Sequence, residues 1–215
     1  MKIAILSEHG YDEALFGLGL SHGITSGFED FTDFVWDEYR FTATPELAHM
    51  QSVAERLAGK GLGHDKFLES IQVWLDIKAA RYWWQEFDTY RVGTSKQSES
   101  TMHTITKREL TQEDFEYPIP QALLDHLNAL CGAYKYTEGE ARDATFLALK
   151  AALPEGFLQR RVVCTNYKVL QNMIRQRYNH RLPEWKEFIW FLADNLHHTE
   201  LLPSRELRAG GIQPA

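Results

Sequence analysis

The sequence contains little cysteine and no long apolar run. Its two cysteines, Cys131 and Cys164, are far apart and lie among apolar neighbours. We therefore interpret both as free buried thiols in a reducing compartment, not as a disulfide. No segment approaches the roughly 20 apolar residues of a membrane helix, and the apolar start of the chain is too short for a signal peptide. We expect a soluble, cytoplasmic protein.

Familiar catalytic and nucleotide-binding motifs are also missing. The chain has no G-x-G-x-x-G and no Walker loop, and no serine lies in the strand-turn-helix elbow of a hydrolase. Adjacent helical histidines, His197 and His198, point in different directions and lack a third ligand, so we predict no metal site. The net charge of -7, from 23 basic and 30 acidic residues, argues against a general nucleic-acid binder.

The 215 residues have a globular composition, with 44% hydrophobic and 25% charged residues. Strands and helices do not alternate as regular β-α-β units, which favours an α+β fold: a modest, mostly antiparallel sheet covered by helices. We predict one domain over residues 1–205 and a flexible tail over 206–215. The expected elements are strands at 1–6, 71–77 and 162–165, turns and a short helix within 9–31, and helices at 45–59 (with Thr44 as its cap), 79–90, 118–134, 139–152, 167–178 and 183–197.

The most informative segment is 74–103, in which a strand leads to an aromatic helix. At Arg91 the chain opens into a loop of Gly, Thr, Ser, Lys and Gln with almost no apolar content. A pocket for an anionic, planar ligand requires such a loop, whereas a core element does not. The plainer interpretation is an ordinary polar loop after a helix whose stripe of Trp83, Phe87 and Tyr90 belongs to the core.

A second polar cluster spans 166–181. On a helix, Lys168, Asn172 and Arg175 project to one side, and Arg177 follows near the end. Fixed cations and amide groups of this kind suit a phosphate and the hydrogen-bonding edge of a base or a flavin ring. The plainer interpretation is a solvated helical face, just as His64 in G-L-G-H-D can be a simple turn residue.

Together these clusters resemble the flavin-dependent thymidylate synthases. That family carries H-E-T-P-F-E-H, then a strand ending in K-A-P, then R-H-R-x-x-S-x-N-E-x-S-x-R-Y, and later N-x-R-S-L-x-N-F-x-x-L-R. The matching positions are His64, Glu69, Lys78, Ala79 and Arg91, then, after one extra loop residue, Ser95, Gln97, Ser100 and His103, and later Asn166, Leu170, Asn172 and Arg177. Lys168 replaces an Arg, and His180 or Arg181 lies near the family's last His.

The resemblance covers roughly residues 60–105 and 153–190, and several of the family's cations are replaced. Thr89 and Tyr90 stand in place of the first Arg and the His of R-H-R, and Met102 in place of the Arg of R-Y. In the family these groups hold the phosphates of FAD and dUMP. Replacing a bidentate cation is not conservative, and each lost contact removes about 1.5–3 kcal/mol of binding.

The resemblance implies a divergent enzyme that transfers a one-carbon unit to C5 of a pyrimidine deoxynucleotide, dUMP. The carbon would come from methylenetetrahydrofolate and the hydride from FAD reduced by NADPH, in a homotetramer. By resemblance, the catalytic residues are Arg177, which polarises the uracil carbonyl, and Ser100. The cofactor-binding residues are His64, Arg91, Ser95, Asn166, Asn172 and His180, and the substrate-binding residues are Glu86, Gln97, Lys168 and Arg181.

Two other functions remain open at this point. The replaced arginines favour a catalytically inactive nucleotide-binding or interaction protein on the same scaffold. A single-stranded nucleic-acid binder would use Trp83 and Trp84 as a stacking surface beside the basic 168–181 face, although the negative net charge opposes it.

Overall fold

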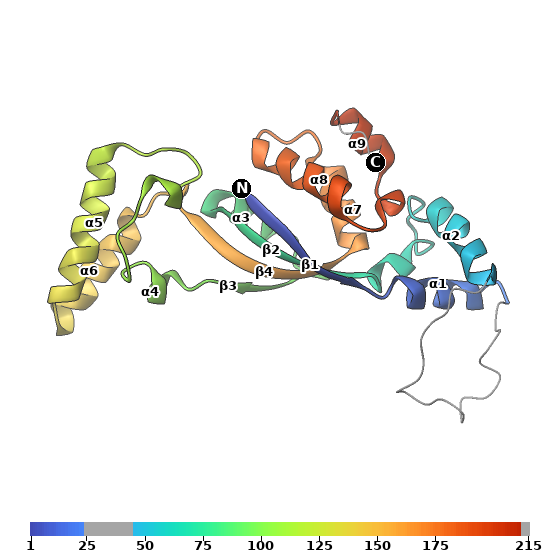
Figure 1. Ribbon diagram of the computed structural model, residues 1–215, viewed down its shortest axis with the longest axis horizontal. Helices are drawn as coiled ribbons and strands as arrows, with labels where there is room; N and C mark the ends of the chain where they lie inside the picture. Colours follow the sequence, from blue (N-terminus) through green and yellow to red (C-terminus); the bar gives the residue numbers. More distant parts are fainter. Residues whose placement is uncertain (24–44, 212–215) are drawn as a thin grey trace, which may run out of the picture. The chain divides into compact units, whose positions relative to one another are not determined.

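The computed structural model describes residues 1–23 and 45–211 (Figure 1). Four strands form an open antiparallel sheet in the order β1-β2-β4-β3, and helices make up most of the remainder, which confirms the α+β prediction. The strands are β1 (Lys2–His9), β2 (Gln72–Ala80), β3 (Ser95–Ser98) and β4 (Leu158–Asn166). No helix in the described ranges is long and apolar enough to span a bilayer.

The alternating pattern predicted for residues 71–77 is confirmed in β2. Val73, Leu75 and Ile77 are fully buried, whereas Trp74 and Asp76 between them are not. The strand continues to Ala80, so the expected helix at 79–90 is shorter, and α3 is Arg81–Phe87. Apolar residues lie on both sides of the boundary between β2 and α3, so periodicity alone does not show where the strand ends.

The polar loop predicted at 93–100 contains a strand that the sequence analysis missed. Residues Ser95–Ser98 form β3 at one edge of the sheet, and only Lys96 among them is partly buried. An edge strand with both faces exposed needs no apolar alternation, so its composition looks like that of a loop. The strand expected at 162–165 is also longer in the structure, where β4 begins at Leu158. The sequence pattern did not reveal this start, because the charged Arg160 and Arg161 interrupt the apolar residues.

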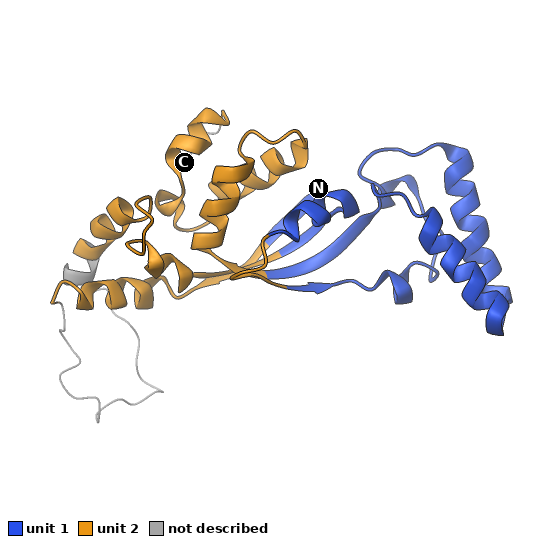
Figure 2. Cartoon of the chain, turned by 180° about the vertical axis from the view of Figure 1, so that it is seen from behind, with its two compact units in different colours: residues 1–4, 76–89, 96–163 blue, residues 5–75, 90–95, 164–215 orange. Residues whose placement is uncertain are grey.

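The chain divides into two compact units (Figure 2). Unit 1 comprises residues 1–4, 76–89 and 96–163. Its helices are α3, α4 (Thr101–Thr104), the short turn η3 (Gln112–Asp114), α5 (Gln121–Tyr136) and α6 (Gly139–Ala152). The last two pack against each other as a hairpin, and the sequence predicted them as helices at 118–134 and 139–152.

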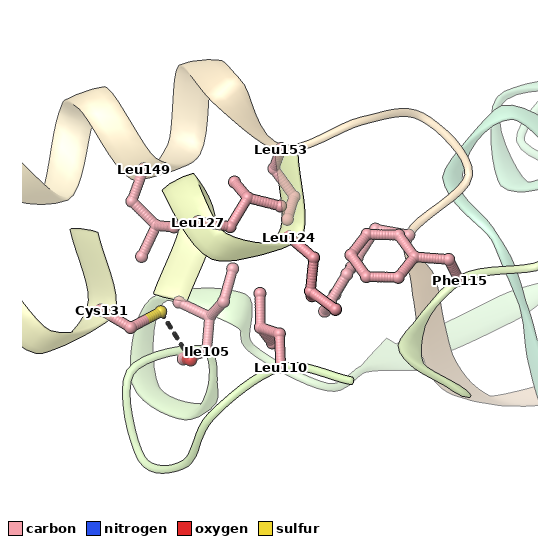
Figure 3. Packing of buried hydrophobic residues seen from close by; sticks show 9 residues of the cluster. Ile105, Leu110, Phe115, Leu124, Leu127, Cys131, Leu149 and Leu153 are labelled. Atoms are coloured by element: carbon pink, nitrogen blue, oxygen red, sulfur yellow. Dashed lines mark hydrogen bonds between the residues drawn. The ribbon is translucent and has the colours of Figure 1, made fainter. Parts of the chain in front are cut away.

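The hairpin of unit 1 has its own apolar core (Figure 3). Leu124, Leu127 and Leu149 are packed together there, and the thiol of Cys131 lies 3.6 Å from the carbonyl oxygen of Ile105. Cys131 is buried and free, as expected, and burial raises its pKa. Cys164 is also free, but it is half-buried, because β4 places it beside Gln72 rather than in the core.

Unit 2 comprises residues 5–75, 90–95 and 164–215. Its helices are α1 (Tyr11–Leu20), α2 (Pro45–Leu57), η2 (Lys66–Glu69), α7 (Tyr167–Arg177), α8 (Pro183–Asn195), η4 (Thr199–Leu201) and α9 (Ser204–Ala209). Helix α9 buries Leu207 completely and reaches into the segment 206–215 as far as Ala209. The predicted cap Thr44 and the part of the 9–31 turn region after residue 23 lie outside the described residues.

Candidate functional site

In unit 2 the first polar segment packs directly on the start of helix α7. Gly93 has a φ of 70°, and a Cβ there would lie 2.9 Å from Cγ2 of Val169 and 3.0 Å from Nδ2 of Asn166. The hydroxyls of Thr94 and Thr165 are 3.2 Å apart. The structure therefore brings together segments 90–95 and 165–169, which are separated by about 70 residues in the sequence.

Arg177 is fixed by two aromatic residues. Its Nε donates to the hydroxyl of Tyr90 at 3.0 Å, and its guanidinium carbon lies 5.7 Å from the Tyr90 ring centre and 5.1 Å from that of Trp185. The Tyr90 hydroxyl in turn donates to Oε1 of Gln176 at 3.0 Å. A planar cation held by a hydrogen bond and by ring faces has little rotational freedom, which suits a group that must orient a ligand.

Asn166 is the N-cap of α7. Its Oδ1 accepts a hydrogen bond from the backbone N–H of Val169 at 3.0 Å, and the side chain is buried. Such a cap satisfies one of the otherwise unpaired donors at the helix start. The capping hydrogen bond by itself explains why position 166 is an asparagine, whether or not the residue contacts a ligand.

Lys168 connects α7 to the segment that carries His64. It forms an ion pair with Asp65, whose side chain is only 1% exposed. The second carboxylate oxygen of Asp65 is buried without a hydrogen-bond partner among the described residues. A buried carboxylate is stable only when it is paired, so this contact holds the 64–66 segment in place.

A cavity of about 1020 Å³ lies between α1, α2 and the η2 segment, entirely within unit 2. His64 and Glu69, both matched to the thymidylate synthase motif, line it. So do three cations that the sequence analysis did not single out: Arg56, Lys60 and Lys66. The signal that could have revealed them is the glycine-rich run G-K-G-L-G-H-D-K after a helix, with a basic residue near each end.

The remaining predicted residues of unit 2 are more exposed. Arg91, Ser95 and Arg181 are solvent-exposed, and Asn172 is exposed with its Oδ1 accepting from Nε2 of Gln176 at 3.0 Å. Nδ1 of His180 accepts from the backbone N–H of Leu182 at 3.2 Å, and its ring meets that of Trp185 edge-on.

In unit 1 the predicted residues Glu86, Gln97 and Ser100 lie on α3, on β3 and at the start of α4. Next to Ser100, the ammonium of Lys150 donates to the hydroxyl of Thr101. Burial lowers the pKa of Lys150, and the positive charge of Arg81 lowers it further. The sequence analysis missed this pair of cations because Lys150 lies on an amphipathic helix far along the chain.

Cations of unit 1 are paired with internal carboxylates, as Arg81 is with Glu155 at 3.4 Å. Lys96 lies 2.6 Å and Arg161 3.0 Å from Asp88, and Arg160 pairs with Asp76. Burial opposes ionisation of Asp88, but the hydrogen bonds from Lys96 and Arg161 outweigh it and leave its pKa below the ordinary value. These cations therefore stabilise the edge of the sheet in this structure.

Burial decides one alternative from the sequence. Trp83 and Trp84 are fully buried, so they offer no surface on which nucleic-acid bases could stack. The described residues contain no group of three His, Cys, Asp or Glu side chains placed to hold a metal. His198 instead stacks on the ring of Tyr11 with a centroid distance of 3.4 Å.

The fold is that of the flavin-dependent thymidylate synthases. Two solved structures of the synthase ThyX from Helicobacter pylori, each with FAD and dUMP, superpose on this chain with TM-scores of 0.67 and 0.68. In both comparisons the identity is 16%, with coverage of 94% of this chain and 98% of the other. At this identity the likeness establishes the fold. Neither family models nor curated protein sequences match the chain.

Proposed function

We propose that this protein is a divergent flavin-dependent thymidylate synthase that binds FAD and dUMP. The observation that carries the proposal is the packing of segment 90–95 on α7, which holds Arg177 against Tyr90 and Trp185. It occurs in a fold shared with synthases whose structures contain both ligands. The motif resemblance and the shared fold are independent supports, because the first rests on residue order and the second on backbone geometry.

The cavity of unit 2 fits part of a dinucleotide cofactor. Its volume of about 1020 Å³ is at the upper end of the range of small-molecule sites. Its wall offers cations, carboxylates and His64, which are the groups that phosphates, hydroxyls and ring nitrogens require. When bound, FAD would supply the hydride chemistry, and the protein would bind and orient the ligands and exclude water.

Arg177 has the best-defined role among the residues of this chain. A guanidinium fixed before the substrate arrives can stabilise negative charge on the uracil carbonyl without reorganising, which favours attack by C5. Tyr90 and Trp185 are positioning residues for it. We propose Arg91, Asn172 and His180 as flavin contacts, and Gln97 and Ser100 as nucleotide contacts.

The test is NADPH oxidation by the FAD-supplemented protein with dUMP and methylenetetrahydrofolate. We expect oxidation that depends on dUMP. We expect Arg177→Ala to slow it by about 100-fold or more, the effect of removing one preorganised charge-stabilising donor. The matched control is Arg175→Ala, which removes a cation from the same helix. Absence of dUMP-dependent oxidation by the wild-type protein, with FAD bound, would contradict the proposal.

A catalytically inactive nucleotide-binding protein is the second candidate. Thr89 and Met102, at positions where the family has Arg, favour it. It predicts that FAD and dUMP raise the melting temperature while NADPH is not consumed. A homotetrameric assembly and a cytoplasmic location are further parts of the main proposal, and size-exclusion chromatography with light scattering tests the first.

A further inference from the structure

Lys150 of α6 differs from half-buried cations such as Lys96 and Arg161 in what it contacts. Those two share the carboxylate of Asp88. Lys150 instead donates to a neutral acceptor, the hydroxyl of Thr101 in α4. Among the described residues, no carboxylate lies within ion-pair distance of its ammonium. Lys150 is therefore a half-buried cation without a counter-charge in this part of the chain.

A second cation, Arg81 of α3, acts on Lys150. The guanidinium of Arg81 donates to the carbonyl oxygen of Leu153 at 3.2 Å and pairs with Glu155 at 3.4 Å. Half of the Glu155 side chain is exposed, so solvent screens this pair and the positive charge of Arg81 is not cancelled. Burial, and then the charge of Arg81, lower the pKa of Lys150 below its ordinary value. More of its amine is therefore neutral at mildly alkaline pH than in an ordinary lysine.

These groups together select one kind of reactant. A neutral amine is a nucleophile that attacks an electrophilic carbonyl carbon. A guanidinium beside it attracts an anion, and its several N–H donors fit the oxygens of a phosphate. A small molecule that joins a reactive carbonyl directly to a phosphate is an acyl phosphate.

We propose that Lys150 is a modification site, which accepts the acyl group of a small acyl phosphate while Arg81 holds the phosphate. The amine nitrogen attacks the carbonyl carbon, a C–N bond forms, and the C–O bond to the phosphate breaks. Inorganic phosphate leaves with the electron pair of that bond, and the nitrogen loses a proton to water. The product is an amide, which carries no charge.

Acylation changes the contact between α6 and α4. The amide has lost the positive charge, so its hydrogen bond to Thr101 is no longer charge-assisted. Thr101 follows Ser100, a nucleotide contact in the proposed function. We therefore expect acylation to raise the KM for dUMP by about threefold or more, the effect of weakening one hydrogen bond. This consequence rests on the proposed function, whereas the modification itself does not.

The experiment incubates the protein with acetyl phosphate and follows the acetylation of each lysine by mass spectrometry. Lys107 and Lys135 are exposed lysines of the same unit and serve as internal references. We expect Lys150 to react at least about threefold faster than either, since lowering the pKa of an amine by one unit raises its neutral fraction about tenfold. The rate at Lys150 should rise with pH and level off below 10.5, the ordinary pKa of a lysine.

The part played by Arg81 is tested by substitution and by competition. Arg81→Gln should slow acetylation of Lys150 by about threefold or more, because the phosphate loses its cation and the pKa of Lys150 rises. Arg142→Gln removes an exposed cation from the same helix as Lys150 and, as the matched control, should leave the rate unchanged. Inorganic phosphate added to wild type should slow acetylation of Lys150 but not of Lys135. This competition decides the matter if Arg81→Gln is not folded by circular dichroism.

The outcomes distinguish this inference from the proposed function. Equal acetylation rates at Lys150, Lys107 and Lys135 would overturn the inference, as would fast acetylation of Lys150 that neither Arg81→Gln nor phosphate slows. Wild type that acetylates Lys150 fastest but does not turn over dUMP would contradict the function and support the modification site. Turnover of dUMP with the same KM before and after acetylation would refute the link to Ser100 and leave the function standing.

Discussion

A methyl group added at Gly93 should push segment 90–95 away from the start of helix α7 in unit 2. Its φ of 70° is in the left-handed region, and a Cβ would lie 2.9 Å from Cγ2 of Val169 and 3.0 Å from Nδ2 of Asn166. The left-handed conformation costs an alanine about 1–2 kcal/mol, and an extra carbon in a tightly packed place costs about 1–3 kcal/mol. We therefore expect Gly93→Ala to lower the free energy of unfolding by about 2–5 kcal/mol.

Urea denaturation followed by tryptophan fluorescence measures this change. Adding Val169→Ala to Gly93→Ala should recover some of the free energy of unfolding that is lost through crowding. It should not recover the part that is lost through the left-handed backbone at residue 93. Gly132→Ala, in the middle of α5 with no atom within 4 Å of its added Cβ, is the matched control and should be neutral or stabilising. A Gly93→Ala protein within about 0.5 kcal/mol of wild type would refute the close packing of segment 90–95 on α7.

Three further predictions concern individual side chains. Asn166→Ala removes the cap of α7 and should cost about 1 kcal/mol in urea denaturation, whereas Asn166→Asp should cost less, because a carboxylate also caps. The pKa of Asp88 is lowered in the folded protein, so its stabilisation is present above the unfolded value near 3.9 and is lost as pH falls through the folded value. Asp88→Asn should therefore flatten the acid side of the stability profile, and an unchanged profile would contradict this. Burial and the hydrogen bond to Glu8 raise the pKa of Tyr167, so its contribution is lost as pH rises above about 10, and melting curves of Tyr167→Phe should decline less there.

The long periodic elements of the fold could be predicted from the sequence. The helix at 139–152 has the predicted bounds, and the alternation along β2 is present. Strand β3 could not be predicted, because an exposed edge strand carries no apolar pattern. Helix α9 could not be predicted either, since its burial depends on the single residue Leu207 and on contacts that form only in the folded chain.

The candidate site was predictable only in part. The order of motifs identified Arg177 and segment 90–95, and the structure places Tyr90 of that segment against Arg177. The sequence could not show that Asn166 caps a helix or that Lys168 pairs with buried Asp65, since both contacts depend on tertiary position. Nor could it show that Arg56 lines a cavity, because exposed cations on helices are common. The assigned roles of the individual site residues remain predictions.

Product analysis by mass spectrometry shows whether the protein methylates dUMP. The protein would be incubated with FAD, NADPH, dUMP and methylenetetrahydrofolate labelled with carbon-13 on its one-carbon unit, and the nucleotides would then be separated. We expect wild type to form dTMP that carries the label, and Arg177→Ala to form much less of it. Recovery of unmodified dUMP alone, from folded protein with FAD bound, would contradict it.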